Sequence, residues 1–294
     1  MDLGEFKEVK IGSDGQIIAD NSDKILIIDA DTIAYTSCLA AEEKVEVLGR
    51  GFYNDKEWED IINNPSFNKE EGCYYTSNIN NVIFNIKDKL ERIKFNTGCK
   101  NYKLYFTIGK DNFRYKIYPE YKNNRKDLRV PLLLKEAKEY CIKELNGIAC
   151  LDWEADDAVV AEKLALGDKA ILCAVDKDVL NAVPGIHFNY YESVKFERSM
   201  HFEPEITELE AAAWPYIQCI MGDTSDNIIG IKGYGTKKAT KAILDVEPED
   251  RWAKVVEIYE KAGRTKDDVL LNFRLVCMTQ LVDGKIVLVE EEDL

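Results

Sequence analysis

Residues 24–29 read Lys-Ile-Leu-Ile-Ile-Asp, and this stretch decides the fold class of the chain. Four consecutive aliphatic residues are typical of a strand that is covered on both faces of a parallel sheet. Residues 30–42 follow with the apolar spacing of a helix. The two segments therefore predict a strand–turn–helix unit with Asp29 at the carboxyl end of its strand.

Strand and helix patterns alternate along the chain beyond this unit. The expected elements are helices over 78–95 and 154–165, a long helix or helix pair over 119–145, and strands over 102–108, 169–175 and 186–191. Residues 43–76 show no regular pattern and are expected to be irregular. The alternation predicts an α/β fold with a mainly parallel sheet flanked by helices, followed by a helical C-terminal part. We expect an N-terminal extension over 1–24, an α/β core over 25–200 and a helical lobe over 201–294.

Composition limits the kinds of chemistry that the chain can perform. Its 294 residues are 46% hydrophobic, enough for a full-sized core, and no apolar run approaches the roughly 20 residues of a membrane span. The N-terminus lacks the features of a secretion signal, so we expect a soluble, cytoplasmic protein without a membrane partner. The eight cysteines have no metal-ligand spacing and only two histidines exist, so chemistry must rest on carboxylates.

The net charge of −15 argues at first against a nucleic-acid partner, but the charges are unevenly distributed. Residues 100–129 hold nine Lys or Arg and three acids, a local net charge of +6. Within this window Tyr121, Lys122, Arg125 and Lys126 predict a basic, aromatic helix face that stacks on bases and contacts phosphates. A solvated surface helix is the alternative.

The sequence has four acidic clusters, three of them at the ends of expected elements: Asp29; Glu154, Asp156 and Asp157; Asp176 and Asp178; Asp223 and Asp226. The carboxyl ends of parallel strands meet at one edge of a sheet, so Asp29 and Asp176 should converge there. Such a group repels itself unless cations neutralise it, and hard divalent ions prefer oxygen ligands. Each cluster alone is more often a helix cap or a solvated turn. Their joint occurrence favours a site for two metal ions that act on a phosphodiester.

Glycines and lysines follow the last acidic cluster. Gly230, Gly233 and Gly235 surround a turn before a helix expected to begin near Thr236, and the lysines of this segment are Lys232, Lys237 and Lys238. Exposed backbone N–H groups and a helix N-terminus predict phosphate docking. An ordinary helix–turn–helix corner is the alternative.

Five segments together resemble the flap endonuclease and 5′→3′ exonuclease family, most closely its short bacteriophage members. They are ILIIDAD (25–31), PEYKNNRK (119–126), WEADDAV (153–159), VDKDVL (175–180) and MGDTSDNIIGIKGYGTKKA (221–239). The resemblance covers roughly residues 24–245. It implies a Rossmann-like, resolvase- or PIN-type core, a helical arch at about 110–145 and a helix–hairpin–helix motif at about 217–245.

The resemblance also implies roles for single residues. Asp29, Glu154, Asp156 and Asp157 would serve a first metal ion, Asp176 would lie between two ions, and Asp178, Asp223 and Asp226 would surround the second. Lys122 and Arg125 would contact the scissile phosphate. The implied cofactors are two Mg²⁺ ions, which Mn²⁺ can replace, and a K⁺ ion at the glycine hairpin. The family usually has an aspartate at the end of its second strand, where this chain offers only the slightly later Asp111. Either Asp111 serves the first metal ion or that ligand is missing.

The expected function is a metal-dependent 5′-nuclease that cuts DNA at 5′ ends, gaps or flaps, a 5′→3′ exonuclease with flap endonuclease and RNase H activity. Its partners would be duplex DNA and RNA–DNA hybrids, in phage-type replication or degradation in the cytoplasm of an infected bacterium, with a monomer favoured. A PIN-type ribonuclease and a catalytically weak DNA-structure-binding protein are the alternatives.

Overall fold

The structure, a computed structural model, describes residues 10–11, 17–18 and 20–294. The expected extension over 1–24 therefore lies largely outside the described residues. Within it, strand β1 (Lys10–Ile11) pairs antiparallel with β2 (Ile17–Ile18).

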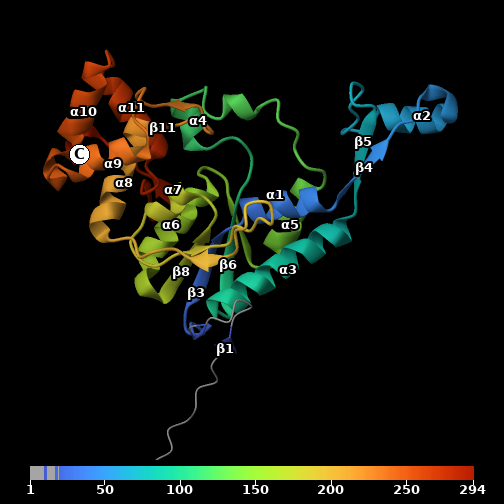
Figure 1. Cartoon of the computed structure of the whole chain (residues 1–294), viewed down its shortest axis with the longest axis horizontal. Helices are drawn as coiled ribbons and strands as arrows, with labels where there is room; N and C mark the ends of the chain where they lie inside the picture. Colours follow the sequence, from blue (N-terminus) through green and yellow to red (C-terminus); the bar gives the residue numbers. More distant parts are fainter. Residues whose placement is uncertain (1–9, 12–16, 19) are drawn as a thin grey trace, which may run out of the picture.

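A six-stranded sheet forms the centre of the molecule (Figure 1). Its order is β10 (His201–Phe202), β9 (Phe188–Asn189), β8 (Ala170–Ala174), β3 (Ile25–Asp29), β6 (Asn101–Thr107) and β7 (Gly147–Cys150). All neighbours are parallel except β9 and β10, which confirms the mainly parallel sheet. Strand β7 was not expected, and β9 is shorter than the expected strand over 186–191.

Alternate residues of β3 pack against helices on opposite faces of the sheet. Leu26 and Ile28 belong to a core with α1 (Asp31–Ala40), α3 (Ile79–Thr97) and α5 (Leu134–Glu144). Ile27 points to the other face and packs with α6 (Ala155–Leu166) and α7 (Lys177–Asn181). Burial on both faces explains the continuous aliphatic run of this strand.

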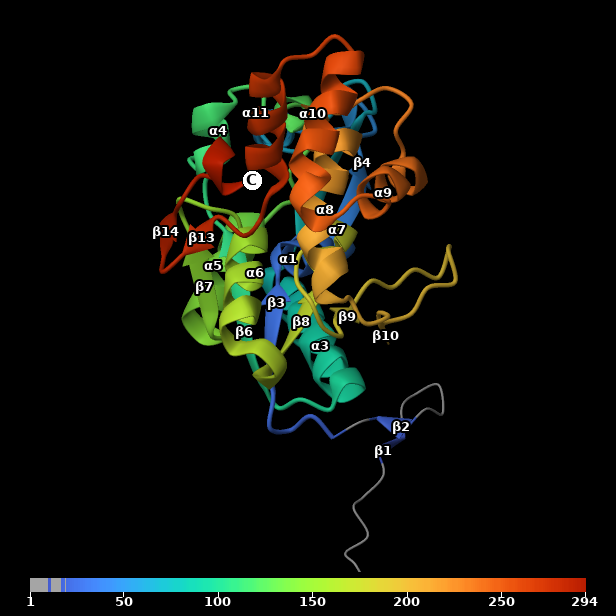
Figure 2. The ribbon, with the colours of Figure 1, turned by 90° about the vertical axis from the view of Figure 1, so that its left-hand side faces the viewer.

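The C-terminal part is a separate helical core. Four helices share it: α8 (Glu208–Met221), α9 (Thr236–Leu244), α10 (Arg251–Lys261) and α11 (Lys266–Val276). The short hairpin of β11 (Gly222–Asp223) and β12 (Ile228–Ile229) belongs to this part. The hairpin of β13 (Leu281–Val282) and β14 (Lys285–Ile286) packs instead on α6. Figure 2 shows these helices stacked above the sheet.

Residues 42–77 are ordered, which corrects the expectation of an irregular segment over 43–76. Strands β4 (Glu42–Glu46) and β5 (Cys73–Ser77) pair along their whole length, and the chain that connects them includes α2 (Asp55–Ile62). We call this unit the projecting hairpin, because it extends away from the sheet and helices in Figure 1. A capping box at Asn54 and Glu57 begins α2.

The prediction of a long helix or helix pair over 119–145 is wrong for residues 119–133. Helix α4 (Phe113–Ile117) ends before this segment and α5 begins only at Leu134. Lys122 and Leu133 adopt left-handed backbone angles, with φ of 52° and 61°, which interrupt a helix. The N–H of Lys122 donates to the carbonyl of Asp226 instead of to a helical carbonyl. We call residues 118–133 the arch segment; it connects α4, which lies beside α11, to α5 (Figure 1).

Short 3₁₀ turns complete the described structure: η1 (Arg50–Phe52), η2 (Asn123–Arg125), η3 (Gly167–Lys169), η4 (Pro248–Asp250) and η5 (Glu291–Asp293). All eight cysteines are buried and unpaired by disulfides. Over the described residues, no helix combines the length and the apolar character that crossing a membrane requires.

Candidate active site

Carboxylates gather beyond the carboxyl ends of β3 and β8. Asp29 is the last residue of β3, Asp176 follows β8 as the N-cap of α7, and Glu154 is the N-cap of α6. A narrow cavity of about 30 Å³ is lined by six acids, Glu154, Asp156, Asp176, Asp178, Asp223 and Asp226. We call it the acidic cavity. Across the described residues, no three of these side chains lie close enough together to hold one metal ion.

Three acids of this region have raised pKa values, although one of them, Asp178, lies 2.9 Å from the Lys177 amine. Burial and then the charge of Asp31 raise the pKa of Asp29 to about 7, and burial and Asp176 raise that of Asp178 to about 6. Burial, Asp29 and Glu154 raise the pKa of Asp156 well above its ordinary value. A hydrogen bond between the Asp29 and Asp156 carboxyl groups opposes the rise in the pKa of Asp29. The atoms that these side chains offer as metal ligands are all carboxylate oxygens, so this set fits a hard divalent cation.

Glu154 and Asp226, in contrast, are paired with cations of the arch segment. The Lys122 amine lies 2.6 Å from Oε1 of Glu154 and 3.5 Å from Oδ2 of Asp226. Arg125 forms an ion pair with Asp226 and donates from Nε to the carbonyl of Ser225 at 2.8 Å. Although burial alone would raise it, Lys122 and Arg114 lower the pKa of Glu154 to about 2.

Tyr121 is buried between the same two carboxylates. Its hydroxyl lies 2.8 Å from Oε2 of Glu154 and 2.8 Å from Oδ2 of Asp226, and its ring packs edge-on against Tyr115. The predicted exposed, base-stacking face is not formed in this structure. The Tyr121 ring is buried and its hydroxyl is hydrogen-bonded to the two carboxylates.

Asp157 lies outside the acidic cavity. Arg114 donates to both of its oxygens, at 2.6 and 2.7 Å, and the N–H of Glu154 donates to Oδ2 as well. Arg114 also donates from Nε to the carbonyl of Leu275 on α11. Both residues are completely or almost completely buried. The structure thus uses Asp157 to join α6, α4 and α11.

Asp111 is exposed and does not line the acidic cavity. At the end of β6 the chain has Thr107, whose hydroxyl accepts the N–H of Ala155 at the start of α6. Two neighbouring polar residues were missed from the sequence. Asn112 donates to Glu154 at 3.1 Å, and Asp31 accepts the N–H of Thr107 while its other oxygen lies 2.6 Å from the Lys138 amine. The signal for Asp31 was its place two residues after Asp29.

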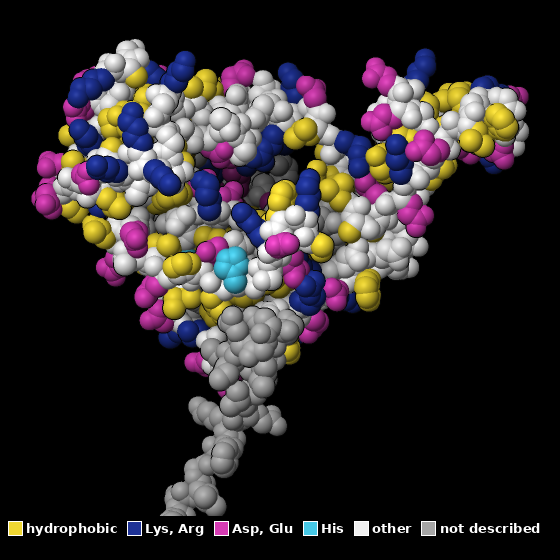
Figure 3. All heavy atoms as spheres, viewed as in Figure 1, with side chains coloured by type: hydrophobic (Ala, Val, Ile, Leu, Met, Phe, Trp, Pro, Cys, Tyr) yellow, Lys and Arg dark blue, Asp and Glu magenta, His cyan; other side chains and the backbone are white. Residues whose placement is uncertain are grey.

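A wider cavity of about 360 Å³ lies on the other side of Tyr121 and Glu154, beneath the arch segment. We call it the arch cavity. Its cationic lining residues are Lys110, Lys122, Arg125 and Lys126. Figure 3 shows a hollow in the middle of this face with Lys and Arg side chains around it. The structure therefore sets an acidic and a basic cavity side by side.

The glycine hairpin follows α8 and precedes α9, which begins at Thr236 as expected. A Cβ atom on Gly230 would collide with the backbone of Met221 and Gly222. Gly233 has a φ of 85°, and Gly235 is the N-cap of α9, with open space around it and no side-chain cap. Lys232, Lys237 and Lys238 are exposed, and the Lys238 amine lies 3.9 Å from the centre of the Tyr234 ring.

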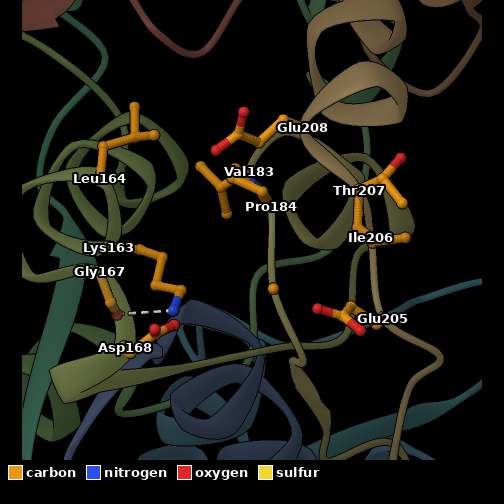
Figure 4. Close-up of a pocket in the computed structure, with 11 residues that line it drawn as sticks. Lys163, Leu164, Gly167, Asp168, Val183, Pro184, Glu205, Ile206, Thr207 and Glu208 are labelled. Carbon is orange, nitrogen blue, oxygen red and sulfur yellow. Dashed lines mark hydrogen bonds between the residues drawn. The ribbon is translucent and has the colours of Figure 1, made fainter.

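A further cavity of about 340 Å³ lies between α6 and the start of α8 (Figure 4). Its buried cation, Lys163, donates to the carbonyls of Gly167 and Ala170 at 2.8 and 2.9 Å. None of the expected site residues lines this cavity, and the Lys163 amine is hydrogen-bonded to backbone carbonyls.

Known proteins share the sequence pattern of this chain, although no protein-family model matches it. A 5′-3′ exonuclease of Buchnera aphidicola subsp. Schizaphis graminum is 29% identical over 157 residues, which cover 49% of this chain and 52% of the relative. The exonuclease of Escherichia phage T7 is 25% identical over 312 aligned residues, covering 92% of this chain and 90% of the relative. The chain is similar to 5′-3′ exonucleases and to the T7 exonuclease. It spans about half the length of the Buchnera relative and 64% of that of a 5′-3′ exonuclease of Aquifex aeolicus.

Solved structures share its fold. A flap endonuclease of bacteriophage T5, in a pseudo-enzyme–product complex with DNA and metal ions, matches with a TM-score of 0.56 and 17% identity over 87% of this chain and 89% of that chain. A zinc-bound 5′-exonuclease of the same phage matches with a TM-score of 0.51 and 19% identity over 66% and 80%. This likeness shows the fold, a mainly parallel sheet flanked by helices.

Proposed function

We propose that the chain is a metal-dependent 5′-nuclease that hydrolyses DNA phosphodiester bonds at 5′ ends, gaps or flaps. The observation that carries this proposal is the acidic cavity at the carboxyl ends of β3 and β8, directly beside a basic cavity. Its similarity to 5′-3′ exonucleases and its fold support the same function. In this proposal the core over 25–200 carries the chemistry and the lobe over 201–294 grips the duplex.

Two divalent cations, Mg²⁺ or in its place Mn²⁺, would be held by a set of seven acids, Asp29, Glu154, Asp156, Asp176, Asp178, Asp223 and Asp226. The raised pKa values of Asp29 and Asp178 support this assignment, because they indicate carboxylates in need of positive charge. When bound, such ions activate water and stabilise the leaving oxygen of a phosphodiester. The paired Asp157 and the exposed Asp111 are left out of the proposed set.

The chain's cations would bind and orient the nucleic acid. Lys122 and Arg125 line the arch cavity and pair with Glu154 and Asp226 of the acidic cavity, where they would contact the phosphate. Gly230, Gly233 and Gly235, with Lys232, Lys237 and Lys238, would bind the duplex backbone through N–H groups at the start of α9. The same proposal includes a K⁺ ion at this hairpin and cleavage of the RNA strand in hybrids. It also includes action as a monomer in a phage-infected cell.

The test is cleavage of end-labelled 5′-flap and blunt duplexes with Mg²⁺, with and without chelator. Asp176→Asn should lower the rate roughly a hundredfold or more, because it removes a charge from the proposed metal site. Asp88→Asn, an exposed change on α3, should leave the rate unchanged. A folded Asp176→Asn protein that cuts at the parent rate would refute the role of Asp176.

A second candidate is a DNA-structure-binding protein with weak catalysis. It is favoured by the position of Asp111 outside the acidic cavity and by the commitment of Asp157 to Arg114. Tight binding of a flap substrate, with no product in either Mg²⁺ or Mn²⁺, would establish this candidate instead of the nuclease.

A further inference from the structure

The strongest unexplained arrangement is the contact between the arch segment and the acidic cavity. Glu154 begins α6 in the core, whereas Asp226 lies in the turn between β11 and β12 of the C-terminal part. The arch segment joins these two carboxylates through the Tyr121 hydroxyl and the Lys122 amine. Asn124 adds a hydrogen bond of 2.7 Å to the carbonyl of Thr224. Residues 121–125 therefore clamp the turn that carries Asp226.

This clamp forms one wall of the acidic cavity. Tyr121 and Glu154 line both the acidic cavity and the arch cavity, so the phenol and the carboxylate form the wall between them. The acidic cavity, at about 30 Å³, has room for about one water molecule, while the arch cavity has about 360 Å³. Two cations and a phosphate need more space than one water molecule, and the clamp holds Glu154 in this wall through the Tyr121 hydroxyl.

The clamp also satisfies charges that a metal ion would otherwise satisfy. The Lys122 amine is within ion-pair distance of Glu154 and of Asp226, and Arg125 forms a second ion pair with Asp226. A divalent cation must compete with these cations for the same oxygens. Asp29, by contrast, accepts the N–H of Asp31 at 3.2 Å, and neither Asp29 nor Asp156 forms an ion pair with a cation of the described residues.

We propose that Tyr121 and Lys122 are positioning residues that withhold Glu154 and Asp226 from metal ions until a nucleic-acid phosphate takes Lys122 and Arg125 away. The proposal rests on the proposed function for the identity of the phosphate. A phosphate in the arch cavity replaces the carboxylates as partner of both cations, and the released carboxylates become available to the metal. Metal affinity and DNA affinity are then coupled, and each ligand strengthens the binding of the other by the same factor.

The test measures Mn²⁺ affinity of the full chain by electron paramagnetic resonance and calorimetry, without any cleavage readout. Lys122→Met without DNA should bind Mn²⁺ about tenfold more tightly than the parent, because it removes the competing amine. Tyr121→Phe, which keeps the buried ring, should shift affinity in the same direction by a smaller factor. Lys122→Arg should restore the weak binding of the parent. Lys116→Met, on the exposed side of α4, is the matched control and should behave as the parent does.

The second arm adds a short 5′-phosphorylated duplex with phosphorothioate linkages at its 5′ end, which resist hydrolysis. This duplex should tighten Mn²⁺ binding by the parent about tenfold and have little effect on Lys122→Met. Equal Mn²⁺ affinity of folded parent, Lys122→Met and Tyr121→Phe without DNA would overturn the proposal. Because this arm uses no cleavage, it can fail while the nuclease function stands, and it can succeed if cleavage is absent.

Discussion

At the scale of single residues, identical carboxylates have different tasks because their neighbours differ. Asp156 and Asp157 are adjacent in sequence, yet Asp156 lines the acidic cavity and Asp157 is enclosed by Arg114. The first turn of a helix directs successive side chains to different sides, so one residue faces the sheet edge and the next faces α4 and α11.

Asp157→Asn should destabilise the protein by about 3–5 kcal/mol, because it leaves the buried Arg114 guanidinium without its carboxylate partner. Urea unfolding followed by circular dichroism measures this change. Asp111→Asn, at an exposed position, should stay within about 0.5 kcal/mol of the parent. Similar small losses for both variants would show that the buried pair contributes little.

The stability of the metal-free protein should fall as pH rises from about 4 to 7. The pKa values of Asp29 and Asp178 are about 7 and 6 in the folded chain, against an ordinary value of 3.8. Below pH 3.8 these groups are protonated in both states, and above it the unfolded chain loses protons that the folded chain retains. The stabilisation is therefore complete at low pH and lost as pH passes through the folded values.

Divalent cations should reverse this loss, because they neutralise the ionised carboxylates. The increase in Tm on adding Mg²⁺ in place of chelator should be larger at pH 8 than at pH 5, as measured by differential scanning fluorimetry. Asp29→Asn should reduce the pH dependence in chelator. An increase in Tm that is the same at both pH values would contradict this account.

At the scale of elements, the glycine hairpin depends on close backbone approach at one position. Gly230 faces the end of α8, where a Cβ atom would meet the backbone of Met221 and Gly222. Gly235 has open space around it and an ordinary φ of −91°. The two glycines thus serve different purposes, packing for the first and an uncovered helix start for the second.

Gly230→Ala should lower the free energy of unfolding by roughly 1–3 kcal/mol, since α8 and β12 must separate to admit the methyl group. Gly235→Ala should change it by no more than about 0.5 kcal/mol. Denaturant unfolding of the two variants beside the parent checks both values. If Gly230→Ala unfolded at the same denaturant concentration as Gly235→Ala, the proposed packing role of Gly230 would be wrong.

At the scale of the whole molecule, the projecting hairpin is attached to the body mainly at its base. Arg129 of the arch segment pairs with Glu42 and stacks on Tyr75, at 4.1 Å from the ring centre. Farther out, Leu48 and Phe52 are 70% and 73% exposed. In Figure 1 helix α2 lies beyond the rest of the molecule. The outer half of this hairpin therefore adds little to the main cores.

Replacing residues 47–72 by Asn-Gly should leave the Tm within about 4 °C of the parent, a change of less than about 1 kcal/mol. An Asn-Gly turn suits a two-residue connection between the paired strand ends Glu46 and Cys73. Calorimetry of the shortened chain measures the Tm. A large drop would show that α2 stabilises the body despite its distance from the sheet.

Local pattern was sufficient to predict the elements that build the sheet. The runs and periodicities predicted β3, α1, α3, β6, α6 and β8 to within a few residues, because each element buries a face that its own sequence encodes. Chain direction in a parallel sheet then placed Asp29 and Asp176 at one edge. The arch segment and the projecting hairpin were predicted wrongly, because contacts with distant residues determine their conformation.

The amino-acid sequence by itself thus determined the parallel sheet, the helical C-terminal part and the strand ends that carry the acids. Only the tertiary structure decided which acids are free, since Arg114 pairs with Asp157 across 43 residues and Tyr121 reaches Asp226 across 105. Periodicity reports which face of an element is buried, whereas the partner of a buried charge depends on elements far away in the chain. That is why Tyr121 lies between two carboxylates, when its sequence context predicted an exposed ring.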